Sequence, residues 1–101
     1  MDTRIEAHLT KSRRGWSVQT IVHREGWPDS VTHGPARTVA WGVYKVVSDA
    51  ADQGWTLTRV TVKGETYPKH KIEGAVIKST QGVLSYTRSK CLQAVAGWEL
   101  S

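Results

Sequence analysis

The sequence predicts one α+β domain over residues 1–101, built on a single antiparallel β-sheet of four or five strands with two helices packed on one face. Three observations predict this class. Two early segments alternate apolar and polar residues, a central segment repeats apolar residues at the helical period, and a β-branched segment follows it. The expected order of elements is β-β-α-β-β-(β)-α. A chain of 101 residues is long enough to bury one core and is near the usual size of one domain.

Residues 3–10 and 16–23 are predicted to pair as a β-hairpin. Both segments alternate, and their apolar sides consist of Ile5, Ala7 and Leu9 in the first and Trp16, Val18, Thr20 and Val22 in the second. The polar turn at residues 11–15 ends in Gly and gives the hairpin a basic tip. Residues 24–35 have the Gly, Pro and Asp content of a loop, within which residues 31–33 are a candidate for a short third strand.

Residues 36–53 are predicted to form a helix. Pro35 would stand at its first turn and Gly54 at its C-terminal cap. The predicted buried stripe is Val39, Val43, Val46, Val47 and Ala50, and the opposite face carries Arg37, Trp41, Lys45, Ser48 and Asp52. Because four valines and Gly42 are poor helix formers, a strand over residues 39–47 stays open as an alternative.

The C-terminal half is predicted to add two strands and a second helix. Residues 55–63 alternate and are rich in β-branched residues, which predicts a strand. Residues 64–70 contain a Pro and are predicted to form a loop, and residues 72–78 are predicted to form another strand. Residues 83–88 fit either a strand or a helix. From residue 89 to 96 the apolar residues follow helical spacing, and Gly97 would cap that helix.

The basic residues form the first group of candidate binding residues. The formal net charge is +5, which favours anionic partners. Between residues 63 and 90 there are six Lys or Arg against two acids, and two more Arg stand at the hairpin tip. Cations in loops suit contact with phosphates, and neighbouring aromatic rings can stack on bases. The candidates for nucleic-acid binding are Arg13, Arg14, Lys69, Lys71, Lys78, Arg88 and Lys90.

Tryptophans provide the second group of candidates. Trp41 would share a helix face with Arg37 and Lys45 rather than with the valines, and Trp27 precedes a Pro in the loop. Exposed Trp is enriched at protein interfaces, so these four residues are candidates for a protein interface. The alternative is that a loop or the second helix covers Trp41, which would then belong to the core.

Motifs for catalysis, metals and cofactors are missing from the sequence. The four His stand at no metal-ligand spacing, Cys91 is alone, and no Gly-rich phosphate-binding loop is present. The nine carboxylates are scattered. We therefore predict no catalytic residue, no metal and no cofactor. No apolar run approaches the ~20 residues of a membrane span, and the first residues lack the apolar core of a signal peptide, so the expected location is cytoplasmic.

Residues 3–62 contain a strand, a second strand with Gly15-Trp16-Ser17-Val18, a turn, the short segment Val31-Thr32-His33-Gly34 and a helix from Ala36. This order resembles the start of HicB-type antitoxin domains. The resemblance implies a fold like part of a double-stranded-RNA-binding domain and a toxin as protein partner. Many members also bind DNA through a C-terminal helical or ribbon motif. This chain departs from the pattern, because residues 27–30 replace the family's Leu-Pro-Gly stretch and no DNA-reading helix pair follows.

The sequence thus predicts a small, basic, non-enzymatic interaction module that binds and masks a macromolecular partner, in the manner of a bacterial or phage regulatory or host-directed factor. A protein is the first choice of partner and nucleic acid the second, with no membrane contact. A homodimer through a free sheet edge stays open. The third hypothesis is a small enzyme whose site carries no recognisable motif.

Overall fold

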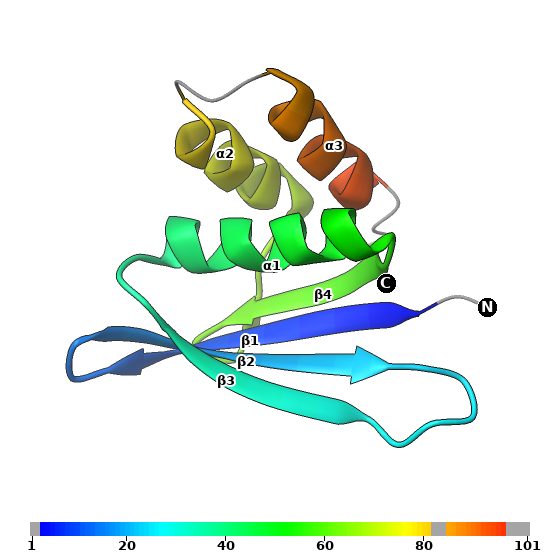
Figure 1. Ribbon diagram of the computed structural model, residues 1–101. Coiled ribbons are helices and arrows are strands. Elements are labelled where there is room, and N and C mark those ends of the chain that lie inside the picture. The colour runs from blue at the N-terminus through cyan, green and yellow to red at the C-terminus, as the bar shows by residue number, and fades with distance from the viewer. Residues whose placement is uncertain (1–2, 82–84, 97–101) are drawn as a thin grey trace.

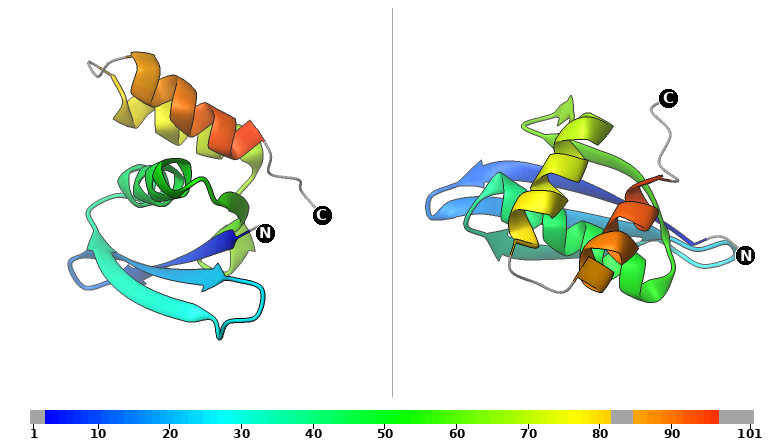
Figure 2. Two further views of the ribbon diagram at one scale, coloured as in Figure 1. Left: turned by 45° about the vertical axis from the view of Figure 1, so that its right-hand side comes forward. Right: turned by 90° about the horizontal axis from the view of Figure 1, so that it is seen from above.

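The computed structural model describes residues 3–81 and 85–96, and within them one five-stranded sheet carries three helices on one side (Figure 1). The strands are β1 (Arg4–Ser12), β2 (Gly15–His23), β3 (Ser30–Ala36), β4 (Thr56–Val62) and β5 (Glu65–Thr66), in the spatial order β3-β2-β1-β4-β5. The helices are α1 (Val39–Gln53), α2 (Lys69–Ser79) and α3 (Ser85–Ala96). Helix α1 lies on the sheet, and α2 and α3 pack over α1 (Figure 2). The α+β class is confirmed, whereas the predicted number of helices is one too few.

The predicted hairpin is present, with β1 and β2 paired antiparallel from Arg4 opposite His23 to Ser12 opposite Gly15. Its apolar side faces α1 and is buried, as the alternating pattern requires; the buried residues are Ile5, Ala7, Leu9, Val18 and Val22. Strand β3 pairs antiparallel with β2 and forms one edge of the sheet, which confirms the third strand.

Helix α1 begins at Val39, three residues later than predicted. Pro35 and Ala36 belong to β3 instead, because there they extend the pairing with β2. The cap is Thr38, whose hydroxyl oxygen accepts a hydrogen bond of 3.1 Å from the backbone N–H of Trp41. The predicted end is confirmed: Gly54 adopts the left-handed conformation, with φ of 71°.

The face of α1 toward the sheet also explains why a glycine stands inside this helix. Val43, Val46, Val47 and Ala50 are buried, as predicted, so the strand alternative for residues 39–47 is wrong. At Gly42 a Cβ would lie only 3.0 Å from a Leu9 methyl carbon and 3.1 Å from a Val18 methyl carbon. The glycine therefore permits a close approach of the helix to the hairpin.

Strand β4 runs parallel to β1, so the prediction of a purely antiparallel sheet is wrong. Helix α1 carries the chain back across the sheet, and β4 then starts at the end where β1 starts (Figure 1). Such a helical crossover is the usual connection between parallel strands. A turn at Lys63 and Gly64, with φ of 53° and 81°, then leads into β5, which pairs antiparallel with β4.

The region after β5 departs most from the prediction. Residues 69–79 form helix α2, so the predicted strand at residues 72–78 is wrong. Ile72, Ala75 and Val76 are buried together, which is the i, i+3, i+4 spacing of a helix packed on α1. The predicted helix at residues 89–96 is confirmed as part of α3, and residues 85–88 are helical too. Residues 83 and 84 and the predicted cap at Gly97 lie outside the described residues.

In the part of the chain that the structure describes, no helix has the length and apolar character needed to cross a membrane.

Candidate functional site

Three turns of the chain meet where β1 and β4 end. They are segment 11–16 at the hairpin tip, segment 36–41 between β3 and α1, and segment 62–66 between β4 and β5. We call these three segments together the basic end; they lie on the left in Figure 1. Strands β1 and β4 are parallel neighbours, and the chain leaves them toward opposite edges of the sheet.

Backbone contacts hold the three segments of the basic end together. The N–H of Lys63 donates a hydrogen bond of 2.9 Å to the carbonyl oxygen of Leu9. Trp16 pairs with Lys11 in β1 and with Ala36 in β3. Gly15 has a φ of 135°, and a Cβ there would lie 2.8 Å from the carbonyl oxygen of Ala36. The hairpin tip and the start of α1 are therefore in direct contact.

The charge of the basic end is strongly positive. Its five cations are Lys11, Arg13, Arg14, Arg37 and Lys63. Glu65 is its one carboxylate, so the formal charge of the three segments is five minus one, or +4. The other carboxylates of the described residues are Glu6, Glu25, Asp29, Asp49, Asp52 and Glu73, and none of them lies on these segments.

Helix α1 adds to this positive field because it begins at the basic end. A helix N-terminus carries a partial positive charge from its unpaired backbone N–H groups. Many helices neutralise this charge with an acidic residue, but the first turn of α1 contains none. The helix dipole therefore acts in the same sense as the five cations.

Two tryptophans at the basic end differ in their surroundings. Trp16 is half-buried against the core, and the amino groups of Lys11 and Lys63 lie 5.1 and 5.7 Å from its ring centroid. These are cation–π contacts that hold both lysines near the ends of β1 and β4. Trp41, in the first turn of α1, is 46% exposed. Its ring contacts Tyr44, with centroids 5.4 Å apart and planes at 39°.

A shallow hollow adjoins the basic end and contains one of the predicted cations. It is lined by Val62, Lys63, Glu65, Thr66, Tyr67, Pro68 and Lys71. The amino group of Lys71 lies 5.9 Å from the centroid of the Tyr67 ring. Lys69, another predicted cation, is the first residue of α2 and half-buried. Lys71 thus extends the positive surface toward α2.

The remaining predicted cations lie elsewhere and have other contacts. Lys78 is exposed in the last turn of α2. Arg88 donates to the hydroxyl oxygen of Thr80 at 3.0 Å and to its backbone carbonyl oxygen at 3.4 Å, which ties α3 to the end of α2. Lys90 forms a 3.1 Å ion pair with Asp52 of α1. The structure therefore does not bring these three residues to the hairpin tip.

The predicted protein-interface residues are divided between two ends of the domain. Arg37 and Trp41 belong to the basic end. Trp27 is 72% exposed in the loop between β2 and β3, at the opposite end, and Val31 nearby in β3 is 48% exposed. Trp41 and Trp27 therefore do not form one surface.

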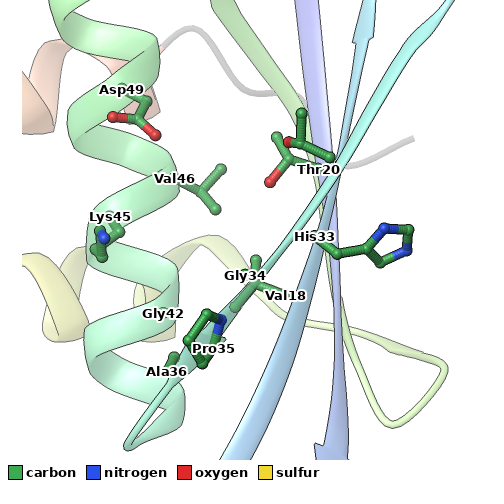
Figure 3. A pocket seen from close by; sticks show the side chains of 11 residues that line it. Val18, Thr20, His33, Gly34, Pro35, Ala36, Gly42, Lys45, Val46 and Asp49 are labelled. Atoms are coloured by element: carbon green, nitrogen blue, oxygen red, sulfur yellow. The ribbon is translucent and has the colours of Figure 1, made fainter.

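Lys45 lines a groove between α1 and β3 (Figure 3). Asp49 follows it one turn later in α1, and Thr20 and Thr32 lie across from them on the sheet. Partial burial raises the pKa of the Asp49 carboxyl above its ordinary value, and Lys45 opposes this shift. The ring of His33, although at the rim, points away from the groove in Figure 3.

At the end opposite the basic end, a group of side chains crosses the open face of the sheet. Nδ1 of His23 lies 2.8 Å from a carboxylate oxygen of Asp29, and its Nε2 lies 3.1 Å from one of Glu6. Nε2 of His8 is 3.8 Å from the other oxygen of Glu6. The hydrogen bond to Glu6, followed by that to Asp29, raises the pKa of His23 above its ordinary value. Among the described residues, no three His, Cys, Asp or Glu side chains are placed to hold a metal ion.

Cys91 is buried in α3, and burial raises the pKa of its thiol. A buried, protonated thiol is a poor nucleophile, so Cys91 is a core residue and not a reactive one.

The chain matches no protein-family model, no curated protein and no solved structure in the comparisons made. The expected likeness to HicB-type domains therefore stays a prediction.

Two of the five cations of the basic end, Lys11 and Lys63, are not among the site residues predicted from the sequence. They stand far apart in the chain and meet because β1 and β4 pair in parallel. The available signal was that each comes at the end of a predicted strand.

Proposed function

We propose that this protein is a non-enzymatic binding module that binds nucleic acid at its basic end. The observation that carries the proposal is the meeting of five cations and two tryptophans in three turns that contain a single carboxylate. Contacts between Lys or Arg and phosphates supply most of the sequence-independent affinity for nucleic acid. Aromatic side chains among such cations add stacking on bases.

The position of these residues in the fold supports the same proposal. They lie at the ends of two parallel strands and beside the N-terminus of helix α1, and a helix N-terminus favours an anionic ligand. The segments 11–16, 36–41 and 62–66 contain no His or Cys, and Glu65 is their one carboxylate. The proposal therefore assigns binding to this surface and no bond-breaking step.

Salt-dependent binding of a labelled oligonucleotide to the full chain tests the proposal. The double variant Arg13→Ala/Arg14→Ala removes two exposed cations from the basic end. The matched control is Arg4→Ala/Arg24→Ala, which removes two exposed arginines from the opposite end, where they line a hollow with Glu25 and Asp29. With a single-stranded probe, two lost phosphate contacts should reduce the slope of log affinity against log salt by roughly 1.4.

The control double variant should keep both the affinity and the salt slope of the unmodified protein, within about twofold in affinity. If both double variants lose affinity equally, net charge rather than the basic end governs binding. If no variant and no salt concentration gives measurable binding, the proposed function is wrong.

A protein partner is the second candidate, and the exposure of Trp27 favours it. This side chain is 72% exposed and Val31 is 48% exposed, an apolar pair of the kind that masking of a protein surface requires. Capture from a lysate treated with nuclease tests this candidate. A specific partner that Trp27→Ala abolishes, and that high salt does not release, would support it.

A further inference from the structure

Trp41 offers a stacking surface among the cations of the basic end. Its side chain remains 46% exposed although it packs against Tyr44. Segment 36–41, in which it stands, contains Arg37 and no acidic residue. A Cβ added at Gly15 would lie 3.4 Å from the carbonyl oxygen of Arg37, so the hairpin tip, which contains Arg13 and Arg14, runs beside the chain at Arg37.

Trp16 and Trp27 do not offer the same combination. The ring of Trp16 already has the amino groups of Lys11 and Lys63 at 5.1 and 5.7 Å. Trp27 is more exposed than Trp41, but its loop sets two carboxylates, Glu25 and Asp29, against the one cation Arg24. Trp41 is therefore the tryptophan on which exposure and positive charge coincide.

An exposed ring of this kind discriminates between forms of nucleic acid. Inside a duplex each base has neighbours stacked on both faces, so a side chain can stack on it only if two neighbouring bases unstack. An unpaired base has a free face, and stacking on tryptophan, tyrosine or phenylalanine is tolerant of sequence. Cations around the ring can then contact the phosphates on either side of the stacked base.

We propose that the ligand of the basic end is single-stranded nucleic acid, with one base stacked on Trp41 and the adjoining phosphates bound by the surrounding Arg and Lys side chains. This inference rests on the proposed function and specifies its ligand. DNA and RNA strands share this chemistry, so both belong in the test.

The experiment measures binding of the full chain to three labelled probes of the same sequence, a single DNA strand, a single RNA strand and a DNA duplex. At least one single strand should bind about tenfold more tightly than the duplex. Trp41→Ala should weaken single-strand binding by about tenfold and leave the salt slope unchanged, because stacking releases no counterions. Trp41→Phe should keep most of the affinity because it retains a ring.

The matched control is Trp27→Ala, which removes the second tryptophan that is exposed among the described residues and should change no affinity. Thermal unfolding of each variant verifies that it is folded, and Trp41→Phe keeps the test valid if Trp41→Ala is not. Equal or tighter binding of the duplex would overturn the single-strand inference and leave the proposed function standing, and so would an unchanged affinity in Trp41→Ala. Absence of binding to all three probes would overturn both.

Discussion

The two ends of the sheet each expose a tryptophan, but they differ in the charge around it. At the basic end, the three segments that include Trp41 contain five cations and one carboxylate. At the other end the charges are mixed: Trp27 shares its loop with Arg24, Glu25 and Asp29, and Arg4 lines the same hollow as these three. An exposed tryptophan indicates a binding surface at either end. The charge around it decides which class of partner the surface suits.

The two ends also differ in how their backbones are fixed. The basic end consists of tight turns that rely on left-handed residues, among them Lys63 and Gly64, and on the close approach of Gly15 to Ala36. The opposite loop is longer, and the contact between the side chains of His23 and Asp29 ties it to β2. A substitution that disturbs one of these backbone or side-chain contacts should therefore change the structure of one end and not of the other.

The largest expected effect comes from adding a methyl group at Gly15. Gly15→Ala places a Cβ 2.8 Å from a backbone oxygen that cannot easily move, at a φ of 135° that side chains rarely adopt. We expect a loss of about 3 kcal/mol in the free energy of unfolding, measured by urea denaturation, because backbone strain and a steric clash add together.

Gly26→Ala is the matched control at the opposite end. Its φ of 80° is also unfavourable for alanine, but a Cβ there meets nothing within 4 Å. The expected cost is therefore only about 1 kcal/mol. Equal costs at the two positions would contradict the contact between the hairpin tip and the start of α1.

Substitution of His23 should have a smaller effect on the free energy of unfolding, and this effect should depend on pH. Because Glu6 and Asp29 raise the pKa of His23, the folded chain binds this proton more tightly than the unfolded chain does. The resulting stability is fully present below the ordinary pKa of 6.5 and is lost as the pH rises through the raised pKa. His23→Gln should therefore destabilise the protein at pH 5.5 and have little effect at pH 9.

The size of this effect should stay below about 1 kcal/mol, because the pair is exposed to solvent. The measurement is urea denaturation across that pH range, with His33→Gln on the exposed face of β3 as control. Binding of an oligonucleotide should be the same for His23→Gln and the unmodified protein at each pH. A variant that changed that affinity would contradict the separation of the two ends.

Much of the fold follows from local patterns in the sequence. Alternation predicts the β1–β2 hairpin and β4, and the Gly54 cap together with the valine stripe predicts α1. The direction of β4 does not follow, since alternation is the same in parallel and antiparallel strands. Helix α2 does not follow from the sequence, because a short apolar segment that includes Ile72 and Val76 fits the repeat of a strand as well as that of a helix. Only its packing on α1 decides between the two.

The candidate site could be predicted only in part for a related reason. The sequence indicates that Arg13 and Arg14 form an exposed pair and that Trp41 shares a helix face with Arg37, but it presents them as two separate surfaces. The contact between Gly15 and Ala36 and the parallel pairing of β1 with β4 make them one. Arg88 and Lys90, by contrast, are cations by sequence that the fold uses to join helices.

The most direct test of the basic end is to map the bound ligand on the protein. Titration of the isotope-labelled full chain with a short single-stranded oligonucleotide, followed by amide chemical shifts, reports which residues lie at the interface. The account predicts the largest shifts in segments 11–16, 36–41 and 62–66 and little change in residues 24–31. Largest shifts in that loop, or around Lys78, Arg88 and Lys90, would contradict it.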